Sequence, residues 1–258
     1  MNASVPDSLL FVAKSTWSPS IRREHALARL AAGHGHPVHF LERQGDVRAL
    51  VAGPRGPWLA GVLGRPRHTT PAEGVDVIQA ATLVPGHRGR FAEHLAGAHL
   101  RRDVARLVAR HRPAAVIVGA PWQWTALRGI SGPRRVFDAA DDWRVLIPER
   151  RALVEDLYRR IAREADAIVL VSDELCDVLA TPVPTVVPNG AADDVLAGAP
   201  VAPPGERRMV YVGTLSPRFD APLLAGALAH LDGWRLDLYG QCQYPGRGAS
   251  PTRSWRAC

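Results

Sequence analysis

The chain has 258 residues, 47% of them apolar, and a formal net charge of +7 at pH 7. This apolar content supports a substantial buried core, which excludes an intrinsically disordered chain. Lys14 is the single lysine among 32 basic residues. Such an arginine bias, in a chain rich in Ala, Gly and Pro, is typical of a base-composition effect, so the charge does not predict a nucleic-acid partner.

The three cysteines, Cys176, Cys242 and Cys258, have no CxxC spacing, and none lies near a pair of histidines. The sequence therefore predicts neither a disulfide framework nor a zinc site. Met1 leads directly into polar residues, and the apolar runs are far shorter than the roughly 20 residues that span a bilayer. We expect a cytoplasmic protein.

Short apolar runs of strand length alternate with helical patterns along most of the chain. Strands are expected at 8–13, 37–41, 75–78, 114–118, 134–137, 167–171 and 185–187, and helices before residue 33 and at 91–111, 152–165 and 173–179. Residues 45–71 are a Gly- and Pro-rich excursion. Near-continuous apolar strands alternating with helices indicate an α/β protein with a doubly wound, Rossmann-like parallel sheet.

A second, shorter unit is predicted after an Ala-, Pro- and Gly-rich linker at 191–205. A strand at 208–212, a helix at 222–230 and a strand at 234–239 make one β-α-β unit. The expected division is 1–200 for an acceptor-side domain, 201–240 for the start of an incomplete nucleotide-sugar-binding domain, and 241–258 for an irregular tail. We interpret this tail either as a flexible segment or as the result of a frame-shift or an early end of the gene.

Ligands of an open parallel sheet bind at the carboxyl ends of its strands, so the residues that follow each strand are candidates. The first such loop contains Trp17, with Arg23 at the start of the next helix, and the segment after the fourth strand carries Trp122 and Trp124. Their aromatic rings suit stacking on a sugar. The structural alternatives are a polar capping turn and core packing.

Three carboxylates, Asp138, Asp141 and Asp142, follow the strand at 134–137. Carboxylates in this position orient hydroxyl groups or act as a general base. Helix N-capping is the alternative role for Asp141 or Asp142.

Gly213 directly follows a strand of the second unit, with Thr214 and Arg218 after it, a pattern that suits a phosphate group.

No GxGxxG follows the first strand, which disfavours a nicotinamide dehydrogenase, and Lys14-Ser15-Thr16 lacks the glycines of a P-loop.

The order of these features resembles the GT-B glycosyltransferases of the family 4 type, and is similar to the teichuronic-acid-type bacterial enzymes. The matching segments are 23–28, 35–38, 136–143, 165–175, 187–190 and 211–215, and the block from Ser172 to Pro188-Asn189-Gly190 is the most specific. The resemblance implies a two-domain hexosyl- or other glycosyltransferase that moves a sugar from a nucleotide-activated donor to an acceptor. It implies neither a metal nor a cofactor.

The resemblance also assigns roles to the candidate residues. Donor-binding residues are Gly213, Thr214 and Arg218, catalytic residues are Asp138, Asp141 and Asp142, and acceptor-binding residues are Trp17, Arg23 and Trp122. Relatives place basic residues after the Tyr-Val-Gly strand, where this chain has Thr214 and Phe219. They also have a histidine where Phe137 and Asp138 stand, and a glutamate-containing donor motif that is absent here.

Three functions remain as hypotheses. The first is a glycosyltransferase acting on a cell-envelope or other glycan, or on a lipid-linked acceptor. The second is a catalytically inactive remnant or binding module. The third is a peripheral protein at the inner face of the membrane, because residues 99–111 are basic and amphipathic. An arginine-coated surface helix that packs on the sheet explains the same pattern.

Overall fold

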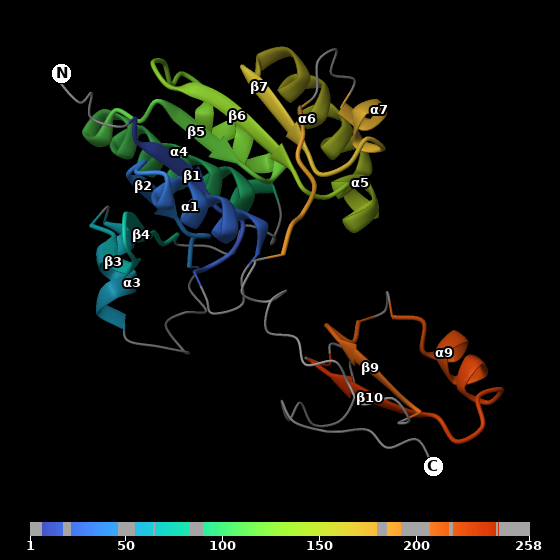
Figure 1. Ribbon diagram of the computed structural model, residues 1–258. Helices are drawn as coiled ribbons and strands as arrows, with labels where there is room; N and C mark the ends of the chain where they lie inside the picture. The colour runs from blue at the N-terminus through green and yellow to red at the C-terminus, as the bar shows by residue number, and fades with distance from the viewer. Residues whose placement is uncertain are drawn as a thin grey trace. The chain divides into compact units, whose positions relative to one another are not determined.

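In the computed structural model of the chain, the residues described are 7–17, 22–45, 55–63, 65–82, 90–179, 185–191, 207–216, 219–240 and 242. The chain divides into two compact units, residues 1–190 and 191–258 (Figure 1). The predicted boundary at residue 200 lies outside the described residues, as do most of the predicted linker and the tail apart from Cys242.

An eight-stranded sheet forms the first unit, in the order β3-β4-β2-β1-β5-β6-β7-β8. The strands are β1 (Leu9–Val12), β2 (Val38–Leu41), β3 (Arg67–Ala72), β4 (Val75–Gln79), β5 (Ala115–Val118), β6 (Arg134–Ala139), β7 (Ala167–Leu170) and β8 (Thr185–Val186). Every neighbouring pair is parallel except β3 with β4. The predicted doubly wound parallel sheet is confirmed, with one antiparallel strand added at its edge.

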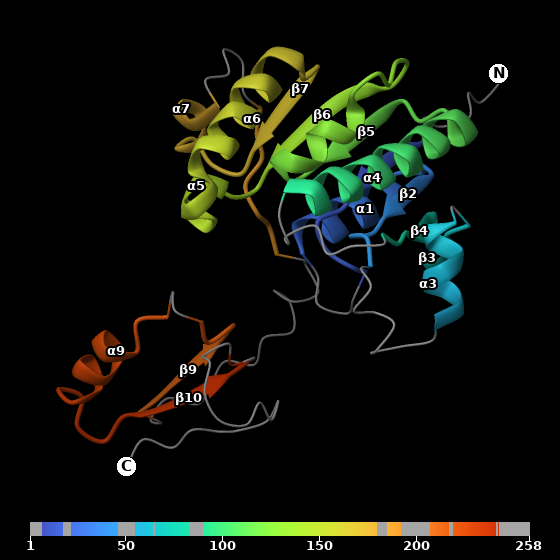
Figure 2. The same cartoon turned by 180° about the vertical axis from the view of Figure 1, so that it is seen from behind.

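Helices cover both faces of this sheet. They are α1 (Arg23–Gly33), α3 (Arg55–Val62), α4 (Arg90–His111), α5 (Trp143–Leu146), α6 (Arg151–Glu164) and α7 (Leu175–Leu179), with two 3-10 helices, η1 (Pro121–Leu127) and η2 (Pro148–Arg150). Figure 1 and Figure 2 show α1 on one face and α4 on the opposite face.

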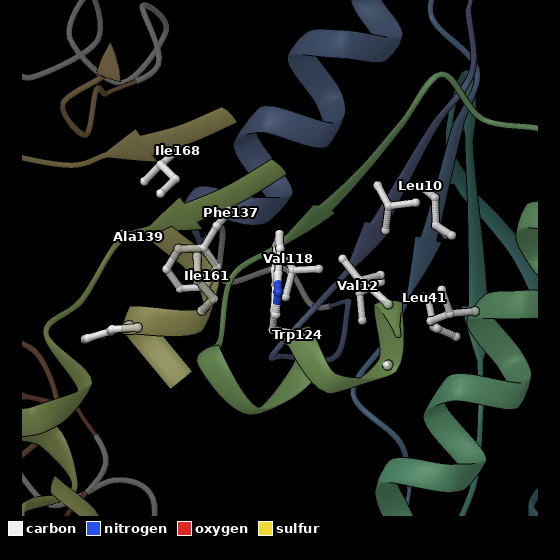
Figure 3. Packing of buried hydrophobic residues seen from close by; sticks show 14 of the residues in the cluster. Leu10, Val12, Leu41, Val118, Trp124, Phe137, Ala139, Ile161 and Ile168 are labelled. Carbon is white, nitrogen blue, oxygen red and sulfur yellow. The ribbon is translucent and has the colours of Figure 1, made fainter. Parts of the chain in front are cut away.

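The alternation of side chains along each strand creates two separate cores. Leu10 and Val12 point into the larger core, on the face covered by α4, η1 and α6, whereas Phe11 and Ala13 pack under α1. Trp124 of η1 lies in the larger core, and Figure 3 shows its ring beside Val118 and Phe137. Core packing, the structural alternative, therefore accounts for Trp124.

The apolar side of α4 packs on the sheet through Val104 and Leu107, which are buried. This packing explains the amphipathic pattern of residues 99–111 without a membrane. Arg112 adopts a left-handed conformation with φ of 47° and is followed by Pro113, so the helix ends at His111. Within the described part of the chain, no helix has both the length and the apolar character needed to cross a bilayer.

Three local features differ from what the sequence indicated. The excursion at 45–71 contains α3 and most of β3, and η1, α5 and η2 were not predicted. Asp138 lies within β6 rather than after it. The β3 strand escaped prediction because it is polar and mostly exposed and contains Pro71, a residue that a sheet tolerates at its edge.

The second unit contains, over its described residues, the predicted β-α-β arrangement. Strands β9 (Arg208–Val212) and β10 (Arg235–Tyr239) are parallel and are connected through α9 (Ala221–Leu228). The Asp220 side chain caps α9 by accepting a hydrogen bond from the backbone N–H of Leu223 at 2.9 Å.

Candidate functional site

The strand order places a topological switch point between β1 and β5. The chain leaves β1 toward β2 on one side and returns to β5 on the other, so the carboxyl ends of these two strands diverge into a crevice. A small hollow lies at this point. It is lined by Phe11, Val12, Ala13, Glu24, Ile117, Gly119 and Asp138.

Arg23 connects three segments that are far apart in the sequence. Its Nε lies 3.0 Å from both carboxylate oxygens of Asp138, and its Nη2 lies 3.0 Å from Oδ1 of the same residue. Its Nη1 donates to the carbonyl of Val187 at 2.8 Å and to Oδ1 of Asn189 at 3.2 Å. One guanidinium therefore holds the start of α1 against the end of β6 and against the segment after β8.

The loop after β1 is fixed by the first turn of α1. The buried carboxylate of Glu24 accepts the backbone N–H groups of Lys14 and Ser15, each at 3.0 Å, and the hydroxyl of Ser15. His25 is fully buried, and its Nδ1 accepts the backbone N–H of Arg22 at 3.2 Å. Its Nε2, 3.1 Å from the Ser15 hydroxyl, therefore carries the proton.

These contacts have a chemical consequence for the loop after β1. The amide groups of Lys14 and Ser15 are already bound to Glu24, so they are not free to bind a phosphate. The rejection of a P-loop here agrees with this geometry. Sequence reasoning missed Glu24 and His25 as site residues, although both stand in the segment 23–28 on which the family resemblance rests.

Each of the three predicted catalytic carboxylates has a cationic partner. Asp138 pairs with Arg23, and Asp141 accepts from Lys14 Nζ at 2.6 Å, with 40% of its side chain exposed. Asp142 is the N-cap of α5: it accepts the backbone N–H of Arg144 at 3.0 Å and pairs with the same guanidinium. The side-chain hydrogen bond from Arg144 lowers the pKa of Asp142 below its ordinary value. The capping role is thus the one that Asp142 fills in the structure.

The two predicted acceptor-binding tryptophans differ in their surroundings. The ring of Trp17 packs against His25 and Phe40, with centroids at 5.1 and 4.9 Å. Trp122 is 42% exposed and meets Trp143 edge to face at 4.6 Å. Of the two predicted rings, that of Trp122 is the more open to a ligand.

In the second unit, Gly213 follows β9 as predicted. Its backbone N–H donates to the carbonyl of Tyr239 at 2.9 Å, so this amide belongs to the sheet. Thr214 is exposed, and its carbonyl accepts from the Tyr211 hydroxyl at 3.4 Å. The third predicted donor-binding residue, Arg218, lies outside the described residues.

Among the described residues, His39, Asp76 and His111 form a group with metal-ligand geometry, and this group is not part of the candidate site.

The comparisons with known proteins establish the fold of the chain. No protein-family model and no curated protein matches the chain in sequence. Solved structures of glycosyltransferases with the GT-B fold do match in shape, and the chain therefore has the Rossmann-like α/β fold of that class.

Two of these structures are informative. A sucrose-phosphate synthase from Thermosynechococcus elongatus aligns with 95% of this chain and 64% of its own, with a TM-score of 0.65 and 14% identity. An alpha,alpha-trehalose-phosphate synthase (UDP-forming) from Burkholderia vietnamiensis aligns with 93% of this chain and 64% of its own, with a TM-score of 0.58 and 13% identity. The chain thus spans about two thirds of the length of these structures.

Proposed function

We propose that the chain is a glycosyltransferase, of the family 4 type and similar to the teichuronic-acid enzymes, that moves a sugar from a nucleotide-activated donor to a glycan or lipid-linked acceptor. The observation that supports this most is the Arg23 cluster. It gathers α1, the end of β6 and the Pro188-Asn189-Gly190 block at the edge where a doubly wound sheet binds its ligands.

In this proposal the two units bind different substrates. The first unit binds the acceptor, with the exposed ring of Trp122 available to stack on a sugar. The second unit binds the donor, with Gly213 leaving space for its diphosphate and with Thr214 and Arg218 stabilising the charge that develops as the sugar leaves.

In this proposal the three carboxylates orient or bind other groups and do not abstract a proton. Arg144 lowers the pKa of Asp142, so this carboxylate is a weak general base. Asp138 then orients Arg23, and Asp142 caps α5. Asp141, the more exposed of the three, is the one that can accept an acceptor hydroxyl.

The experiment is a transfer and binding assay on the purified chain. Uridine, guanosine and adenosine diphosphate sugars are titrated by calorimetry, and release of the nucleoside diphosphate is followed with and without candidate glycan acceptors. We expect one donor class to bind and to be turned over. Binding of none of these donors would contradict the proposal for this chain.

A matched variant separates the acceptor side from the donor side. Trp122→Ala removes the exposed ring in the first unit, so we expect slower transfer with donor binding unchanged. The alternative, a binding module without turnover, is favoured by the pairing of all three carboxylates with cations. Sugar transfer above the rate of a heat-denatured control excludes that alternative.

A further inference from the structure

Three histidines and an aspartate gather under the C-terminal end of α4. His39 and Asp76 are register partners, each the second residue of its strand, on the neighbouring parallel strands β2 and β4. His68 comes from the edge strand β3, and His111 is the last residue of α4. The cluster therefore lies toward the amino ends of β2 and β4, whereas the candidate acceptor site lies at the carboxyl ends of β1, β5 and β6.

The side chains of this cluster converge on a small volume. One ligand atom from each of His39, Asp76 and His111 can be chosen so that all three lie within 4.8 Å of one another. The two imidazole rings have centroids 3.7 Å apart, and His39 Nδ1 lies 3.5 Å from Asp76 Oδ2. His68 Nδ1 lies 3.0 Å from both carboxylate oxygens of Asp76.

One atom of the cluster is left without a partner. Nε2 of His111 is buried and makes no hydrogen bond, which is unusual for a buried polar atom. A buried imidazole nitrogen with no hydrogen-bond partner is available to bind a metal ion.

We propose that His39, Asp76 and His111 bind a zinc ion, with His68 orienting the carboxylate of Asp76. Imidazole nitrogens and carboxylate oxygens are the ligands that Zn²⁺ takes, at about 2.0–2.2 Å. Tetrahedral geometry at that distance puts ligand atoms roughly 3.4 Å apart, so side-chain rotations that close the present spread of 4.8 Å by about 1.4 Å suffice. A histidine held against a ligating carboxylate is an ordinary outer-shell partner.

The ion would act as a clamp on the fold. It ties β2, β4 and the end of α4 together, and through His68 it also holds the edge strand β3. Since the cluster shares no residue with the candidate acceptor site, zinc binding stands or falls independently of the proposed sugar transfer.

The test uses the full chain without an affinity tag, freed of metal by a chelator. Calorimetry with Zn²⁺ is expected to show one ion per chain, and Co²⁺ is expected to give the visible absorption of a low-symmetry site. A hundredfold excess of zinc over its dissociation constant is expected to raise the melting temperature by about 5–10 °C. A dissociation constant weaker than about 1 mM, or no rise in melting temperature, would overturn the proposal.

Variants separate this cluster from other histidines. His111→Gln is expected to weaken zinc binding more than 100-fold, and His68→Gln by about 10- to 100-fold. The double variant His34→Gln/His36→Gln, in the exposed loop before β2, is the control and should bind zinc like the parent. Loss of the ion in that control but not in His111→Gln would refute the assignment, and His39→Gln repeats the test if His111→Gln does not fold by circular dichroism.

Discussion

Arg23→Met removes the cation from a buried ion pair without removing much volume. The side chains of Arg23 and Asp138 are only 10% and 8% exposed, so water cannot replace the lost partner of the carboxylate. Breaking such a pair from one side costs about 3–5 kcal/mol of folding free energy. For a unit of this size, that loss lowers the melting temperature by about 6–20 °C.

The assay for Arg23→Met is urea unfolding of the chain, followed by tryptophan fluorescence, to which the buried Trp124 contributes. The matched control is Arg151→Met, because Arg151 pairs with Glu155 on the exposed side of α6. Removing that surface pair costs at most about 1 kcal/mol. We also expect Arg23→Met/Asp138→Leu to regain much of the lost stability, because both charges are then gone. Equal losses for the Arg23 and Arg151 variants would refute the reasoning, since the buried pair would then contribute no more than an exposed one.

Three further predictions concern the loops at this edge. Burial raises the pKa of Tyr158 to about 12, so between pH 10 and 12 the unfolded chain releases a proton that the folded chain retains. The contribution of Tyr158 to the free energy of unfolding is therefore fully present below pH 10 and falls by up to about 2.7 kcal/mol between pH 10 and 12. The variant Tyr158→Phe should lack this fall, and ultraviolet titration of tyrosinate measures the shifted pKa. Asp142→Ala should lower the free energy of unfolding, measured in urea, by about 1 kcal/mol, and Asp142→Asn by much less, because Asn also caps a helix. Arg144 lowers the pKa of Asp142 in the folded state, so the stabilisation from the ionised carboxylate is present above the ordinary aspartate pKa. It is lost as the pH falls through the folded-state pKa. Trp122→Ala should change stability by about 0.5 kcal/mol or less but weaken acceptor binding roughly tenfold, as measured by the KM for the acceptor.

The sequence predicted the parts of the fold that are determined locally. The buried strands β1, β2, β4, β5 and β7 are short apolar runs, and that pattern was sufficient to predict them. The polar strand β3 exists because β4 offers it a pairing edge, which is a tertiary cause with no apolar signal. The same limit applies to α3, whose sequence contains Gly and Pro.

The candidate residues of the site were predictable, but their partners were not. Arg23 and Asp138 were assigned separate roles, acceptor binding and catalysis, because nothing in a sequence shows that residues 115 positions apart form an ion pair. Similarly, His39, Asp76 and His111 have no metal-site spacing. They come together only because parallel register sets His39 opposite Asp76 while α4 ends above them.

Two successive residues at the start of α1 stabilise different parts of the carboxyl edge. Neighbouring positions on a helix point about 100° apart, so Arg23 can reach β6 and the segment after β8 while Glu24 reaches the loop after β1. The loop after β1, the end of β6 and the segment after β8 are therefore each contacted by a charged side chain of the same helical turn. A disturbance of that turn should displace the loops together, whereas a substitution at Asp138 should release only the Arg23 side.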